Sequence, residues 1–180
     1  ENILRPNGKL GDASDKAIFA WSYKSGGSCA GNCRVEKVAD GVASGQWDAN
    51  GIQIQFSSGD GWIQVALPQA VSCTHTAVIG WSGSHMPSGS NGAYVQASAD
   101  GTSGSWTTVG QWTNHPGASQ AYIHLGEYSV SDVDSRLTSD LGVTLSGSNN
   151  AYKYWRVGGT GWTNGWMLIM EWFLACSVLV

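Results

Sequence analysis

Short runs in which apolar and polar residues alternate recur along this chain. Every second residue is apolar in residues 52–56 and again in residues 63–67, where Pro68 is expected to end the run. A period of two residues is typical of a strand with one buried face. Similar strand-like runs follow at residues 76–81, 93–97, 107–112, 121–125, 143–145, 152–157 and 167–174. Because clusters rich in Gly and Ser separate these runs, the sequence predicts an antiparallel β-sandwich.

Residues 131–142 break this alternation and have the period of a helix. Ser131 is a candidate N-cap, with the acidic Asp134 three positions further on. Gly142 stands where a helix C-cap is expected, after three apolar residues spaced four apart: Val133, Leu137 and Leu141. We expect one short helix near residues 132–141, packed as a lid over one end of the sandwich. The predicted fold class is therefore all-β with one short helix, in a single domain over residues 1–180.

The composition excludes several classes of partner. Charged residues make up 12% of the chain, about half the usual ~25%. With 9 basic residues spread thinly and a net charge of −4, the chain lacks the cationic stripe of a nucleic-acid-binding protein, and an anionic membrane surface would be a poor partner. The longest apolar stretch, residues 166–180, contains Glu171 and Ser177 and is shorter than the ~20 residues of a membrane helix. We expect an extracellular, secreted or surface-exposed protein that does not insert into a membrane. Because the sequence begins at Glu1 and not at Met, we also expect a processed or excised chain.

Four cysteines leave the redox state open. Cys29 and Cys33 flank a short loop that a Gly allows to close, while Cys73 and Cys176 lie in strand-like runs. Four cysteines allow three pairings, and the sequence alone does not choose among them. A local Cys29–Cys33 bond leaves Cys73 and Cys176 either bonded to each other or as two buried thiols. A zinc site is not expected, because the spacing lacks a second close pair.

The sequence does not predict an enzyme. Its four histidines are far apart, and it contains neither a Gly-x-Ser-x-Gly motif nor a phosphate-binding Gly-rich loop before a helix. The three aspartates of the predicted helix are better explained as a solvated face and a complement to the helix dipole: Asp132, Asp134 and Asp140.

Four short motifs follow one another in a set order. Asp40-Gly41 precedes Trp47; residues 62–67 read Trp-Ile-Gln-Val-Ala-Leu; residues 97–101 precede Trp106; and residues 154–157 precede Glu171. In this order the motifs resemble the discoidin family, also called the coagulation factor 5/8 type C or galactose-binding-like domain. The resemblance covers roughly residues 35–175. It implies an antiparallel jelly-roll β-sandwich, and it implies that Trp47, Trp106 and Trp155 fill the core.

The resemblance also implies a structural Ca²⁺ ion. In many sugar-binding members the Asp of the first Asp-Gly motif and the Glu of the last strand hold the ion, together with loop carbonyls and a Thr hydroxyl; these positions correspond to Asp40 and Glu171. Ca²⁺ prefers six to eight oxygen ligands, so the chemistry is suitable. This chain has Gly45 at the Thr position, where Ser44 could substitute. Alternatively, Asp40 caps a turn and Glu171 pairs with Arg156.

Several tryptophans lie beside Gly- and Ser-rich loops, among them Trp21. Exposed indoles stack on sugar rings, and loops at one end of a sandwich are where such sites are built. His85 and His115, with Asn91, Asn114 and Asn164, could hydrogen-bond the sugar hydroxyls. We therefore predict a non-catalytic module that binds a glycan or polysaccharide. Its predicted ligand-binding residues are Trp81, His85, Trp112, His115 and Trp162.

A structural role is the alternative. The apolar residues 172–180 continue to the last residue of the chain. Such a strand needs a neighbour, either its own core or the sheet edge of another subunit. Self-association through this strand would suit a subunit of an extracellular or viral assembly.

Overall fold

The computed structural model describes most of the chain, with gaps: residues 3–4, 19–24, 29–30, 33–43, 51–55, 61–81, 93–111, 122–124, 126, 128–147, 149–159 and 166–178. Its strands are β1 (Ala20–Lys24), β2 (Cys29–Ala30), β3 (Ile52–Gln55), β4 (Gly61–Gly80), β5 (Tyr94–Ser98), β6 (Thr107–Gln111), β7 (Tyr122–His124), β8 (Val143–Thr144), β9 (Tyr152–Gly159), β10 (Trp166–Ile169) and β11 (Glu171–Val178). The 3₁₀-helix η1 (Val35–Ala39) and the helix α2 (Val130–Arg136) complete the described elements. The predicted β-sandwich with one short α-helix is confirmed.

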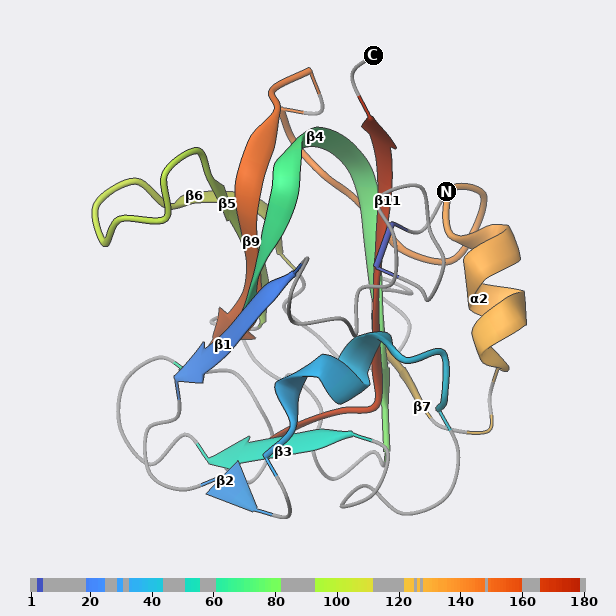
Figure 1. The fold of residues 1–180 in the computed structure, drawn as a ribbon. Helices are drawn as coiled ribbons and strands as arrows, with labels where there is room; N and C mark the ends of the chain where they lie inside the picture. The colour runs from blue at the N-terminus through green and yellow to red at the C-terminus, as the bar shows by residue number, and fades with distance from the viewer. Residues whose placement is uncertain are drawn as a thin grey trace.

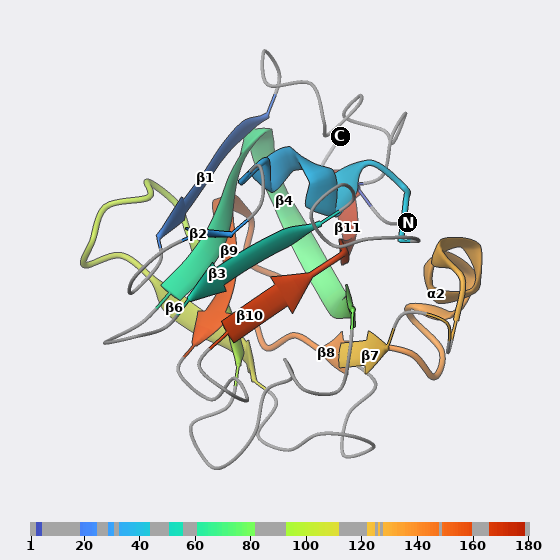
Figure 2. The same ribbon diagram turned by 90° about the horizontal axis from the view of Figure 1, so that it is seen from below.

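Strand β4 belongs to both layers of the sandwich (Figure 1). Its first half pairs with β1 and β9, and β5 and β6 extend that layer. Its second half pairs with β11 and β8, and also with β7, the one parallel pair among the described strands. A small sheet of β10, β3 and β2 lies beside them (Figure 2).

The expectation that Pro68 ends a strand is wrong. Strand β4 continues through Pro68, but its pairing with β9 shifts register between Ala66 and Val71. Residues 68–70 are exposed, and the strand arches over at this point (Figure 1). Proline cannot donate a ladder hydrogen bond and is tolerated at such irregularities. The strand therefore passes from one layer into the other at an irregularity that tolerates proline.

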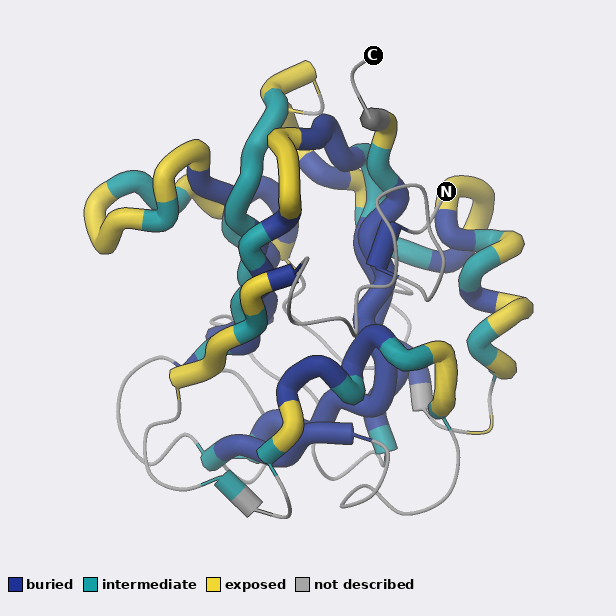
Figure 3. The backbone as a smooth tube through the Cα atoms, viewed as in Figure 1, coloured by how far each residue is buried: buried dark blue, intermediate teal, exposed yellow. Residues whose placement is uncertain are grey.

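The core has two parts, one on each face of the β4–β11 pair. Side chains alternate along a strand, so Trp172 and Leu174 face the main core between the layers, whereas Phe173 and Ala175 face a second cluster. Residues of helix α2, including Val133, cover this second cluster. Strand β11 is thus buried on both faces, as the dark tube in Figure 3 shows. The apolar run that suggested self-association has its neighbours within the chain as far as Ala175.

Helix α2 begins and ends earlier than predicted. Its N-cap is Ser129, not Ser131: Ser129 Oγ accepts the Asp132 N–H at 3.1 Å, and the Asp132 carboxylate accepts the Ser129 N–H at 3.1 Å. The helix stops at Arg136, whose carbonyl accepts the N–H groups of residues 139–141. It lies against the outer face of β4 and β11 rather than over an end of the sandwich (Figure 1).

The predicted strand at residues 167–174 is two strands. β10 ends at Ile169 and β11 begins at Glu171, because Met170 leaves the ladder and donates its N–H to the Ile79 carbonyl at 2.8 Å. In the part of the chain that the structure describes, no helix is long and apolar enough to span a membrane.

All four cysteines form disulfides, one local and one long-range. Cys29 bonds to Cys33, and Cys73 bonds to Cys176. The second bond links β4 to β11 at directly paired positions. It joins residues 103 positions apart, so it restricts the unfolded chain far more than the local bond does.

We predict that the long-range disulfide contributes more to stability. Replacing Cys73 and Cys176 together by Ala should lower the free energy of unfolding by about 4–5 kcal/mol, against about 2 kcal/mol or less for Cys29 and Cys33 together. Urea unfolding of the two double variants gives the comparison. Equal losses would contradict the assigned role of the β4–β11 bond.

Candidate functional site

Of the five residues predicted to bind a glycan, the described part of the chain includes Trp81. This residue directly follows β4, is half-buried and packs against the second core cluster. Part of its indole therefore serves the core rather than a ligand. His85, Trp112, His115 and Trp162 lie outside the described residues, so their grouping around a sugar stays a prediction.

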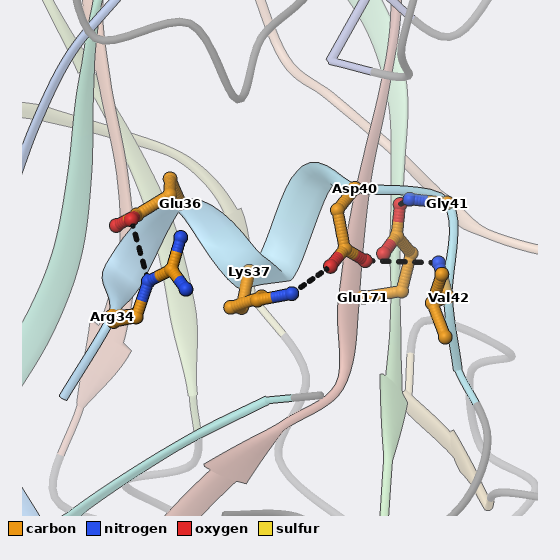
Figure 4. A network of polar contacts seen from close by, with 7 residues as sticks. All are labelled: Arg34, Glu36, Lys37, Asp40, Gly41, Val42 and Glu171. Carbon is orange, nitrogen blue, oxygen red and sulfur yellow. Dashed lines mark hydrogen bonds and ion pairs between the residues drawn. The ribbon is translucent and has the colours of Figure 1, made fainter. Parts of the chain in front are cut away.

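The structure brings together the two predicted metal ligands (Figure 4). Asp40 caps the C-terminus of η1, and Glu171 is the first residue of β11. The Gly41 N–H donates to Glu171 Oε1 at 3.2 Å, and the Val42 N–H donates to Asp40 Oδ1 at 3.0 Å. The second oxygen of Asp40 accepts from Lys37 Nζ at 3.0 Å. Asp40 thus caps a turn and also contributes to a small acidic centre.

Glu171 is an unusual group in this centre. It is 0% exposed, and its Oε2 atom has no hydrogen-bond partner among the described residues. Burial, and secondarily the nearby negative charge of Asp40, raise the pKa of Glu171 well above its ordinary value. Asp134 adds a smaller effect in the same direction, and the hydrogen bond from Gly41 opposes it. A proton or a cation at this carboxylate would relieve the unfavourable burial.

The alternative partner for Glu171 is wrong, because Arg156 contacts other groups. The Arg156 guanidinium lies 4.1 Å from the ring centre of Trp106 and 5.6 Å from that of Trp62. Its Nε donates to Gln96 Oε1 at 2.7 Å.

Three tryptophans were expected to fill the core. Trp155 is buried as expected, whereas Trp106 is half-buried beneath the Arg156 guanidinium, and Trp47 lies outside the described residues.

The donor set suits a hard cation. Two carboxylates approach each other, and one carboxylate oxygen is buried without a hydrogen-bond donor in the described structure. Within that structure no group of three or more His, Cys, Asp or Glu side chains could hold a metal, so backbone carbonyls would have to complete the coordination. Ca²⁺ accepts such carbonyls readily. The Lys37 ammonium is the competing cation for Asp40.

A pocket that the sequence reasoning missed lies between β1 and η1. Its volume is about 310 Å³. Six residues line it: Trp21, Ser22, Tyr23, Cys33, Val35 and Glu36. The alternation of Trp21 and Tyr23 along one strand was the available signal, because it places both aromatic rings on one face. Recognising the pocket also required knowing that η1 lies opposite β1.

Comparisons with known proteins identify the fold. No protein-family model matches the sequence, and no curated protein matches it. Among solved structures, chitosan-binding module 1 of a chitosanase/glucanase from Paenibacillus sp. IK-5 matches with a TM-score of 0.56 and 18% identity, over 97% of this chain and 98% of that one. The family 32 carbohydrate-binding module of NanJ from Clostridium perfringens, in complex with galactose, matches with a TM-score of 0.55 and 13% identity, over 88% and 94%.

The fold is that of family 32 carbohydrate-binding modules. A second family 32 module, from AlyQ in complex with 4,5-unsaturated mannuronic acid, matches with a TM-score of 0.53 and 16% identity, over 87% of this chain and 94% of that one. The galactose-binding-like sandwich predicted from the motif order is therefore confirmed as a fold.

The raised pKa of Glu171 predicts how stability depends on pH in the presence of a chelator. A carboxyl whose pKa is raised on folding stabilises the protein below its unfolded value of 4.5, and this stabilisation is lost as the pH rises through the folded-state pKa. The wild-type protein should therefore lose stability as the pH rises above about 5. Glu171→Gln should lose less stability over the same rise in pH, and it should be about 1–3 kcal/mol more stable than the wild type where Glu171 is ionised.

Thermal melting in chelator across this pH range tests the prediction. Asp140→Asn is the matched control, because Asp140 is exposed and pairs with Arg136, which lowers its pKa. This variant should follow the wild-type profile. Parallel profiles for the wild type and Glu171→Gln would contradict the assignment of a raised pKa to Glu171.

Proposed function

We propose that this chain is a non-catalytic module that binds carbohydrate. The observation that carries the proposal is the agreement in fold along nearly the whole chain with modules solved as chitosan-binding, or bound to galactose or a mannuronic acid derivative. Because one fold can host different functions, support from the chain's own residues is also needed. The tryptophans that the sequence places beside Gly- and Ser-rich segments support the proposal, since indoles are the side chains best suited to stack on sugar rings.

The proposed loop site uses Trp112, His115 and Trp162, with His85 and the exposed part of Trp81. A shallow site of this kind suits a polymer chain and binds weakly at each contact. Two disulfides favour an oxidising compartment, so we propose an extracellular location.

The structural-subunit alternative has lost its main support. It rested on an apolar chain end in need of a neighbour, and residues 172–175 are buried between the two core clusters of this chain. Light scattering tests self-association: a large ordered assembly would favour the structural role over the binding module.

We also propose that the Asp40–Glu171 centre holds a structural Ca²⁺ ion. The unsatisfied Oε2 of Glu171 supports this, because a cation there would offset the cost of burying the carboxylate. Asp40 and Glu171 would supply carboxylate oxygens, and neighbouring carbonyls would supply the rest. The ion would fix the turn after η1 to the start of β11, and Lys37 would have to release one Asp40 oxygen.

Calcium is expected to raise the melting temperature of the wild-type protein. A ligand that binds only the native state stabilises it by mass action, by about 2.7 kcal/mol at a concentration of about 100 times Kd. Glu171→Gln and Asp40→Asn should lose the response, whereas Lys37→Gln should strengthen it because no ammonium then competes for Asp40. Identical melting in calcium and in excess chelator would exclude the ion.

Removing loop tryptophans should abolish retention on polysaccharide. Trp112→Ala and Trp162→Ala should each cost ~1–3 kcal/mol of binding, by analogy with other aromatic stacking platforms, with little change in melting. Trp81→Ala should lower melting as well, because its indole packs against the core. Trp106→Ala is the control: this indole packs beneath Arg156, so melting should fall while retention persists. If Trp112→Ala and Trp162→Ala both retain full binding, the loop site is wrong.

A further inference from the structure

The pocket between β1 and η1 has one aromatic wall. Trp21 and Tyr23 are two residues apart on β1, and their partners on β4 are Val65 and Ile63, which face the main core. Both aromatic side chains therefore lie on the inner face of β1, at the edge of the layer. Tyr23 remains 39% exposed, and it and Val42 are the only exposed large apolar residues in the described structure. An aromatic surface is thus accessible from solvent at this edge.

The indole of Trp21 is held in place by buried groups. Its ring packs edge-to-face against Trp172, with ring centres 6.4 Å apart and an angle of 69° between the planes. Trp172 is 0% exposed, and its Nε1 donates to Thr76 Oγ1 at 3.0 Å. The Thr76 hydroxyl in turn donates to the Phe173 carbonyl at 2.9 Å. A ligand would meet an indole whose orientation is already fixed, which reduces the entropy lost on binding.

The opposite wall is also anchored, and it carries a carboxylate that is paired with Arg34. The Cys29–Cys33 disulfide ties β2 to the residue that precedes Arg34, and Val35 and Glu36 follow on η1. Glu36 is 5% exposed and accepts from Arg34 Nε at 3.1 Å. Among the six lining residues, Glu36 is the one with a charged side chain. The pocket therefore combines aromatic rings with a fixed carboxylate.

This geometry points to a saccharide subsite that takes one pyranose ring, neutral or amino-substituted, and that disfavours uronic acids. The aromatic wall suits the apolar face of a ring, and the carboxylate can accept hydroxyl or ammonium protons. A volume of about 310 Å³ lies near the lower limit for ligand pockets, about 300 Å³, so a chain end fits better than a long polymer segment. The inference rests on the proposed carbohydrate-binding function.

The subsite is separate from Trp81, the described member of the proposed loop site. Trp21 packs against the main core cluster, whereas Trp81 packs against the second cluster, on the other face of the β4–β11 pair. A module with two sites can hold a branched or multivalent glycan more tightly than either site alone.

The test measures binding of three methyl glycosides by calorimetry: galactoside, glucosaminide and glucuronide. Tyr23→Ala should weaken binding of the first two at least about tenfold, equivalent to about 1.4 kcal/mol. Glu36→Gln keeps the shape of the side chain and removes its charge, so it should lower the preference for glucosaminide over glucuronide by a similar factor. Lys24→Ala is the matched control on the same strand, because Lys24 is exposed and does not line the pocket.

Several outcomes separate this inference from the proposed function. A double variant with Trp112 and Trp162 replaced by Ala should lose retention on polysaccharide but keep monosaccharide binding, with the indole N–H signal of Trp21 shifting on titration. If Tyr23→Ala and Glu36→Gln melt normally and bind as the wild type does, the subsite is wrong even if polysaccharide retention persists. If the wild type binds none of the three glycosides, the subsite is also wrong, and the retention assay alone decides the module's function.

Discussion

Strand β4 sets the position of the two layers relative to each other, because one half of the strand belongs to each layer. The bend depends on residues 68–70, which leave the ladder and face solvent, so the proline costs no buried hydrogen bond. The second half of β4 then pairs along the full length of β11 and is bonded to it through Cys73 and Cys176. Both candidate sites are built from residues that this pair of strands positions: Glu171 begins β11, and Trp172 supports Trp21.

Burial of β11 on both faces has a consequence for its first residue. Helix α2 covers the outer face, so a carboxylate at position 171 has no route to bulk water and receives one hydrogen bond, from Gly41, within the described structure. A buried charge with so little compensation destabilises a fold, whereas a hydrophobic residue of similar size would not. The acidic centre is therefore better explained by a ligand, a cation or a proton, than by packing. This is the physical reason to test calcium before assigning the centre a purely structural role.

Much of the fold could be predicted from the sequence, and each error has its own physical cause. The period of two located most strands, since alternation reports directly which residues face the core. The helix was misplaced because two Ser–Asp pairs compete to start it, and only Ser129 with Asp132 forms the reciprocal hydrogen bonds. Asp40 and Glu171 are distant in sequence, and only the family resemblance placed them together. The β1–η1 pocket could not be predicted, because no local pattern states which helix will lie opposite Trp21 and Tyr23.

The proposed pocket holds its indole in a fixed orientation, and this bears on affinity. Side chains on loops must lose conformational freedom when a ligand orders them, at a cost of up to about 1–2 kcal/mol for each ordered residue. Trp21 has already lost that freedom on folding, through its contact with Trp172 and the hydrogen bond from Trp172 to Thr76. A small rigid pocket can therefore bind one ring with the few contacts it has. Because Trp21 and Trp81 contact different core clusters, a change in one of these indoles need not disturb the other.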